Sequence, residues 1–97
     1  MFLGAFLEGR LVGSVIASFD GRKGWINRLA VDPNERRQRI GRKLTEEAER
    51  VLKTRGSQIT AALIETDNSP SLLLFKKCGF MVHKDILYLT KRDSGQV

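Results

Sequence analysis

Apolar positions in the first third of the chain come in three short runs separated by turn-forming residues. The runs cover residues 2–7, 11–19 and 25–31. A glycine-containing gap follows each of the first two runs, at residues 8–10 and 20–24. Short gaps of this kind between apolar runs are typical of β-hairpins. The pattern therefore predicts three antiparallel strands.

The spacing of the apolar residues changes after residue 36. They now recur at three- and four-residue intervals, at Ile40, Leu44, Ala48, Val51 and Leu52. This spacing predicts a helix with one apolar face. Its other face is charged, and two acid–base pairs four residues apart, Glu46 with Arg50 and Glu49 with Lys53, are expected to stabilise it. Gly56 is expected to end the helix as the first residue beyond its C-cap.

A strand, a helix and two further strands are expected in the remainder. Residues 58–65 are apolar on both faces, which is typical of a central strand buried on both sides. A helix is expected from a cap at Asn68 or Ser69 to Lys77, and residues 80–82 and 86–90 are expected to pair as strands. A strand–helix–strand passage implies one parallel pair. The order β-β-β-α-β-α-β-β thus predicts a mixed, mostly antiparallel α+β fold, with residues 1–97 as one domain.

Composition narrows the class of protein. The 97 residues include 17 Lys and Arg against 11 Asp and Glu, a net charge of +6 that favours an anionic partner. The single cysteine, Cys78, can form neither an internal disulfide nor a cysteine-rich metal site, so we expect no metal and a reducing compartment. No apolar run approaches the ~20 residues of a membrane span. The opening run lacks the basic lead of a signal peptide. The expected location is the cytoplasm, without a membrane partner.

Positive charge gathers where the third strand meets the first helix. Five cations lie within residues 36–43, namely Arg36, Arg37, Arg39, Arg42 and Lys43. Cations oppose the dipole at a helix N-terminus, so a bound anion would explain them; the alternative is a solvated charge run. The free N–H groups of the first turn suit a phosphate. Gly41 is expected to let a phosphate approach the backbone.

Two stretches resemble motifs of the GNAT acetyltransferases. Val31-Asp32-Pro33, then Arg36-Arg37-Gln38, then Ile40-Gly41-Arg42-Lys43-Leu44 resembles motif A, whose amides hold the pyrophosphate of acetyl-CoA in that family. Asn68, Ser71, Phe75, Gly79 and Phe80 have the spacing of motif B. The resemblance covers nearly the whole chain, from the family's second strand onward. It implies that the family's N-terminal strand and first two helices are lacking here.

The resemblance implies an acetyl-CoA-dependent N-acetyltransferase that acts on a primary amine of an unidentified acceptor. A distortion of the third strand near residues 29–31 is expected to offer a backbone N–H to the thioester carbonyl. The residues expected to bind the cofactor are Leu29, Ala30, Val31, Arg36, Arg37, Gln38, Arg39, Ile40, Gly41, Arg42, Lys43, Asn68, Ser71 and Phe75.

Three departures bear on catalysis. Arg39 stands where the family usually has its first loop glycine, and Phe75 where many members have a proton-donating tyrosine. Asn27 and Arg28 occupy the region where many members have a carboxylate base. The chain is therefore either a transferase that relies on positioning or a CoA-binding module with little or no transferase activity.

Two catalytic candidates remain. Glu65 would act as a base at the end of its strand, with a solvated strand end as the alternative. Tyr88 would donate a proton, with core packing as the alternative.

Two further expectations concern partners. Nucleic-acid binding is disfavoured because the basic stretch contains no aromatic residue for base stacking. A homodimer is expected, because residues 2–7 would form an apolar sheet edge and one sheet face would lie bare. Charged substitutions at Leu3 or Leu7 are expected to dissociate it.

Overall fold

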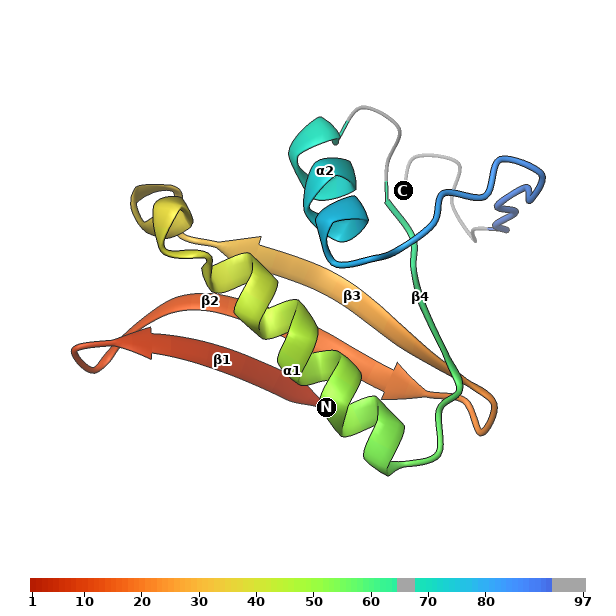
Figure 1. Cartoon of the computed structure of the whole chain (residues 1–97), viewed down its shortest axis with the longest axis horizontal. Helices are drawn as coiled ribbons and strands as arrows, with labels where there is room; N and C mark the ends of the chain where they lie inside the picture. Colours follow the sequence, from red (N-terminus) through yellow and green to blue (C-terminus); the bar gives the residue numbers. More distant parts are fainter. Residues whose placement is uncertain (65–67, 92–97) are drawn as a thin grey trace.

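The computed structural model describes residues 1–64 and 68–91, except for the side chains of residues 36–38. Its elements in chain order (Figure 1) are β1 (Phe2–Leu7), β2 (Arg10–Phe19), β3 (Lys23–Val31), a 3₁₀ helix η1 (Pro33–Gln38), α1 (Ile40–Thr54), β4 (Ile59–Ala62) and α2 (Ser69–Lys77).

The strands form one mixed sheet in the order β1-β2-β3-β4. The pairs β1–β2 and β2–β3 are antiparallel, whereas β3 and β4 are parallel because α1 connects them. The predicted α+β class and the predicted parallel pair are both confirmed. Gly56 has a φ of 101° directly after the C-cap of α1, so the predicted helix end is confirmed as well.

Helix α1 packs across one face of the sheet (Figure 1), and two glycines allow its close approach. A Cβ on Gly24 of β3 would lie 2.7 Å from Leu52 Cδ1. A Cβ on Gly13 of β2 would lie 2.9 Å from Ile40 Cγ2. The apolar stripe of α1 therefore rests almost directly on the strand backbones, and the core lies between the helix and the sheet.

The opposite face of the sheet carries an apolar cluster that is open to solvent. Phe2, Phe6 and Leu11 are 62%, 64% and 48% exposed. They surround Gly4, where an added Cβ would lie within 3.6 Å of all three side chains. Leu3 and Leu7 point the other way and pack against the core, as the two-residue repeat of a strand requires. We call Phe2, Phe6 and Leu11 the bare-face cluster.

Two expectations about the C-terminal part are wrong. Residues 80–91 contain no strand, and Leu87 and Leu89 are each 84% exposed. Without a neighbour on its outer side among the described residues, β4 is an edge strand, not a central one, and Ile59 is 53% exposed. An apolar run becomes a strand only when a partner pairs with it, and an isolated two-stranded hairpin is marginally stable.

The charged face of α1 also differs in detail from the expectation. Arg50 pairs with Glu47, not Glu46, while Glu46 pairs with Arg42 at 3.4 Å.

Within the described ranges, no helix has the length and apolar character that crossing a bilayer requires.

Candidate functional site

The third strand contains a β-bulge at the point where the sequence predicts a distortion. Ile16 pairs with Asn27, but Ser14 pairs with Ala30, so Arg28 and Leu29 together face a single residue of β2. Arg28 has a φ of 55°, the left-handed conformation that glycine usually occupies at such bulges. The distortion thus begins one residue before the predicted stretch. A bulge interrupts the hydrogen-bond ladder and frees backbone polar groups.

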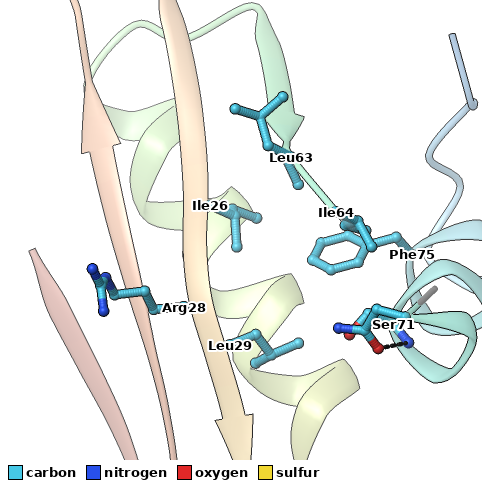
Figure 2. Close-up of a pocket in the computed structure, with 9 residues that line it drawn as sticks. Ile26, Arg28, Leu29, Leu63, Ile64, Ser71 and Phe75 are labelled. Carbon is cyan, nitrogen blue, oxygen red and sulfur yellow. Dashed lines mark hydrogen bonds between the residues drawn. The ribbon is translucent and has the colours of Figure 1, made fainter. Parts of the chain in front are cut away.

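A cleft opens between β3 and β4 just beyond their paired stretch. The parallel pairing ends at Ile26 and Ala62. Beyond these residues α2 lies beside the strands, and a cleft of about 160 Å³ remains between them (Figure 2). Its lining residues are Ile26, Arg28, Leu29, Ala62, Leu63, Ile64, Asn68, Ser71 and Phe75. Four predicted cofactor-binding residues, Leu29, Asn68, Ser71 and Phe75, thus come together here from β3 and α2.

Motif B holds the α2 wall of this cleft. Asn68 is the N-cap, and its Oδ1 accepts a hydrogen bond from the Ser71 N–H at 3.3 Å. Phe75 lies on the cleft side of α2 and is only 6% exposed. Its ring meets Phe80 edge-on, with the centroids 5.0 Å apart. Gly79 has a φ of 92°, which turns the chain so that Phe80 reaches Phe75.

Motif A builds the entrance to α1. Asp32 caps η1, with its Oδ1 accepting from the Asn34 N–H at 2.9 Å. Arg39, with φ 58° and ψ 29°, joins η1 to α1, and no side chain caps the N-terminus of α1. The first amides of α1, near Ile40 and Gly41, have no intrahelical acceptor and form the positive end of the helix dipole. This helix start has the character of an anion site.

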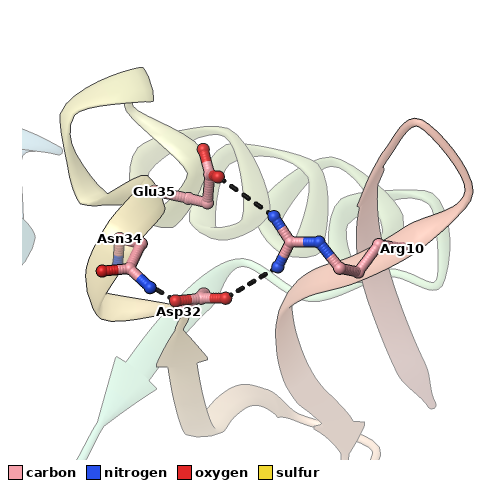
Figure 3. Close-up of polar contacts among 4 residues, drawn as sticks. All are labelled: Arg10, Asp32, Asn34 and Glu35. Carbon is pink, nitrogen blue, oxygen red and sulfur yellow. Dashed lines mark hydrogen bonds and ion pairs between the residues drawn. The ribbon is translucent and has the colours of Figure 1, made fainter.

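An ion-pair bridge secures this entrance to the β1–β2 turn (Figure 3). Arg10 donates from Nη1 to Asp32 Oδ2 at 2.9 Å and from Nη2 to Glu35 Oε1 at 3.1 Å. The pKa of the Asp32 carboxyl lies below its ordinary value, first because the Asn34 N–H donates to it and next because Arg10 does. No local pattern predicts this bridge, since its members are 22 and 25 positions apart.

Gly41 lies at a close packing contact, and its approach to a phosphate stays a prediction. A Cβ on Gly41 would lie 3.1 Å from Leu74 Cδ2, 3.6 Å from Val31 Cγ2 and 3.9 Å from Leu29 Cδ2. The missing side chain therefore faces α2 and β3. The same contacts place the start of α1 beside Leu29, and hence beside the cleft.

The other predicted site residues are placed as follows. Ala30 and Val31 line a separate, open hollow with Leu11 and Asp32. The backbones of Arg36, Arg37 and Gln38 form the end of η1. Arg39, Arg42 and Lys43 are exposed, Ile40 is buried in the core, and Arg42 pairs with Glu46.

Of the two catalytic candidates, only Tyr88 belongs to the part of the chain that the structure describes. Glu65 lies outside the part of the chain that the structure describes. Tyr88 is 71% exposed and does not line the cleft, so the alternative that it packs in the core is wrong. Its segment has no strand partner to carry it inward. Ile26, Leu63 and Ile64 line the cleft without having been predicted, because apolar strand residues look alike whether they face a core or a cleft.

The parallel strands β3 and β4 separate at the bulge, beside the N-terminus of α1, which no side chain caps. This arrangement defines a class of mixed-sheet domains in which a cleft lies next to an anion site. The model of the acetyltransferase (GNAT) family matches residues 1–80. The chain belongs to this family.

Relatives agree with this assignment. Acetyltransferase SG1711 of Sodalis glossinidius is 29% identical over 92 residues, covering 95% of this chain but 65% of that protein. The solved structure of aminoglycoside N-acetyltransferase AAC(6')-Iy in complex with CoA matches with a TM-score of 0.82 at 19% identity, covering 94% of this chain and 75% of that one. AAC(6')-IG from Acinetobacter haemolyticus matches with a TM-score of 0.76 at 21% identity, covering 94% and 69%. At these identities the solved structures show a shared fold.

Proposed function

We propose that the chain is an acetyl-CoA-dependent N-acetyltransferase, acting as one domain on a primary amine. One observation carries the proposal: Leu29 belongs at once to the bulge, to the cleft lining and to the contact with the N-terminus of α1. A ligand with a phosphate group at one end and a reactive carbonyl at the other would therefore place its phosphate at the anion site, its middle in the cleft and its carbonyl at the free strand amides.

Each part of the site then has a task. The backbone amides of residues 37–42 bind the pyrophosphate, with the exposed cations of motif A nearby. The ring of Phe75 supports the pantetheine arm inside the cleft. A free N–H at the bulge, near Leu29, donates to the carbonyl oxygen as negative charge develops on it.

The chemistry proposed for this site is direct transfer. The amine nitrogen attacks the thioester carbonyl carbon, the C–S bond breaks, and CoA leaves as a thiolate. The proton that the amine loses passes through water to the thiolate. Phe75 has no proton to give, and Asn27 and Arg28 offer no carboxylate, so catalysis rests on positioning.

Binding and turnover test the proposal separately. Acetyl-CoA should raise the thermal midpoint, since a ligand of the native state stabilises it. Acetyl-pantetheine, which lacks the pyrophosphate, should raise the midpoint less at the same concentration. Release of CoA thiol in the presence of a broad amine panel measures transfer. Stabilisation without turnover would favour the alternative, a CoA-binding module, and no stabilisation at millimolar acetyl-CoA would overturn both.

We also propose that the protein is a cytoplasmic homodimer. The bare-face cluster supports the dimer, because exposed contiguous apolar surface usually marks an interface. The partner would then supply part of the wall around the acceptor.

A further inference from the structure

The bulge residue Arg28 is unusual in both backbone and side chain. Its φ of 55° is one that side chains other than glycine rarely adopt. Its side chain is exposed and leaves β3 on the side away from Phe75 and Ile26 (Figure 2). A left-handed residue that is not glycine is often kept in place for function.

Arg28 also lacks an acidic partner among the described residues. Among the described residues, no carboxylate forms an ion pair with Arg28. Asp32, four positions further along the chain, is already paired with Arg10 at 2.9 Å. The Arg28 guanidinium is therefore available to a ligand.

The face on which an acceptor arrives follows from the packing. Helices α1 and α2 lie on the cleft side of β3, where Leu52 approaches Gly24 and Phe75 lies beside Ile26. An acceptor must then reach the bulge from the other face of the sheet. Neighbouring Asn27 faces that side, because it pairs with Ile16 and, through it, with Phe2 of the bare-face cluster.

We propose that Arg28 determines acceptor specificity and selects amines that carry a carboxylate close to the amino group. This inference rests on the proposed N-acetyltransferase function. A guanidinium binds a carboxylate through two parallel hydrogen bonds and so orients the amine as well as holding it. The same cation repels acceptors with several ammonium groups, so aminoglycosides should be poor substrates of this chain.

Matched acceptor pairs test the proposal through a ratio. For each pair, an amino acid such as β-alanine is compared with its carboxamide, and kanamycin serves as the polycation. The full chain should prefer the carboxylate by about tenfold or more in kcat/KM, the factor expected for a hydrogen bond to a charged group. Arg28→Asn, which tolerates positive φ, should bring the ratio close to one. Arg28→Lys should keep a preference, because it keeps the charge.

The outcomes distinguish a failure of the role proposed for Arg28 from a failure of the proposed N-acetyltransferase function. Transfer with a preference for carboxamides or kanamycin, or a preference that survives in Arg28→Asn, would overturn the role of Arg28 and leave the transferase intact. Absence of transfer to every acceptor would reject the transferase, and the role of Arg28 with it. Because both acceptors of a pair meet the same variant, a general loss of rate in Arg28→Asn leaves the ratio interpretable. A retained thermal shift with acetyl-CoA shows that the variant is folded.

Discussion

Arg28 and Arg39 each hold a left-handed backbone conformation where the chain changes course. Arg28 begins the bulge of β3, and Arg39 joins η1 to α1, with φ values of 55° and 58°. The conformation costs roughly 1–2 kcal/mol for a residue with a Cβ. The departure of Arg39 from the family's glycine therefore concerns backbone strain as well as space for a phosphate.

Arg39→Gly should raise the free energy of unfolding by about 1 kcal/mol, because glycine adopts positive φ without the Cβ clash. It should also weaken acetyl-CoA binding slightly, because an exposed cation beside the anion site is lost. Denaturant unfolding and ligand titration measure the two effects. Arg55→Gly is the matched control, since Arg55 is also exposed but has a φ of −92° and should gain no stability. A clear gain of affinity in Arg39→Gly would mean that Arg39 crowds the phosphate.

Phe75 combines a structural role with a proposed binding role. It is buried at 6% exposure and contacts Phe80, so Phe75→Ala should destabilise the protein by ~3–5 kcal/mol and weaken acetyl-CoA binding. Phe75→Tyr should preserve binding and raise turnover by restoring a proton donor. Thermal melting with and without acetyl-CoA measures stability and binding, and release of CoA thiol measures turnover. Unchanged stability and affinity in Phe75→Ala would contradict the placement of this ring.

At the scale of elements, α1 is positioned from both ends. Gly13 and Gly24 admit its apolar stripe onto the sheet, and the Arg10 bridge holds the η1 segment that leads into it. The anion site at its N-terminus thus depends on the β1–β2 turn, far away in the sequence.

The Asn34 N–H and Arg10, which both donate to the Asp32 carboxylate, should give a pH-dependent contribution to stability. Because the folded pKa of Asp32 lies below its unfolded value of 3.8, the contribution is complete well above pH 3.8 and disappears as the pH falls through the folded pKa. Asp32→Asn should therefore be less stable than the parent at pH 7, and the difference should shrink below pH 3.8. Denaturant unfolding at pH 7 and pH 3 measures it. A difference that stays constant with pH would mean that the charge of Asp32 is not what stabilises η1.

For the whole molecule, the sheet has one covered and one open face. The bare-face cluster is on the open side, whereas Leu3 and Leu7, at which the sequence led us to expect a dimer contact, pack against the core. The strand was predicted correctly, but the residues expected at the contact lie on the covered face, one position along the strand from those on the open face. A shift of one residue reverses the faces of a strand, so only packing decides between them.

The dimer proposal leads to a test at Phe6. Phe6→Lys should dissociate the dimer because it places a charge in the bare-face cluster while leaving the core intact. Leu3→Lys, its matched control on the opposite face, should destabilise the fold instead. Sedimentation at micromolar concentration measures the state of association. A parent protein that sediments as a monomer would reject the dimer, and a Phe6→Lys variant that stays dimeric would place the contact elsewhere.

Local patterns in the sequence determined the strands and α-helices and their order up to α2, but not the 3₁₀ helix η1. These patterns are the two-residue repeat, the helical repeat from Ile40 and the turn glycines. Each involves residues only a few positions apart, so it can be recognised from the sequence alone. The motif spacing likewise indicated the family and the place of Phe75 in the cleft, and the capping residues narrowed the helix cap to Asn68 or Ser69, of which the structure shows Asn68.

Tertiary structure alone decided the rest, because the deciding contacts join distant positions. Only the packed fold shows that Gly41 faces Leu74, that Arg10 reaches Asp32, and that Arg28 takes the glycine position of the bulge. It also decided that the apolar residues after Gly79 form no strand among the described residues, because a strand exists only when another strand pairs with it.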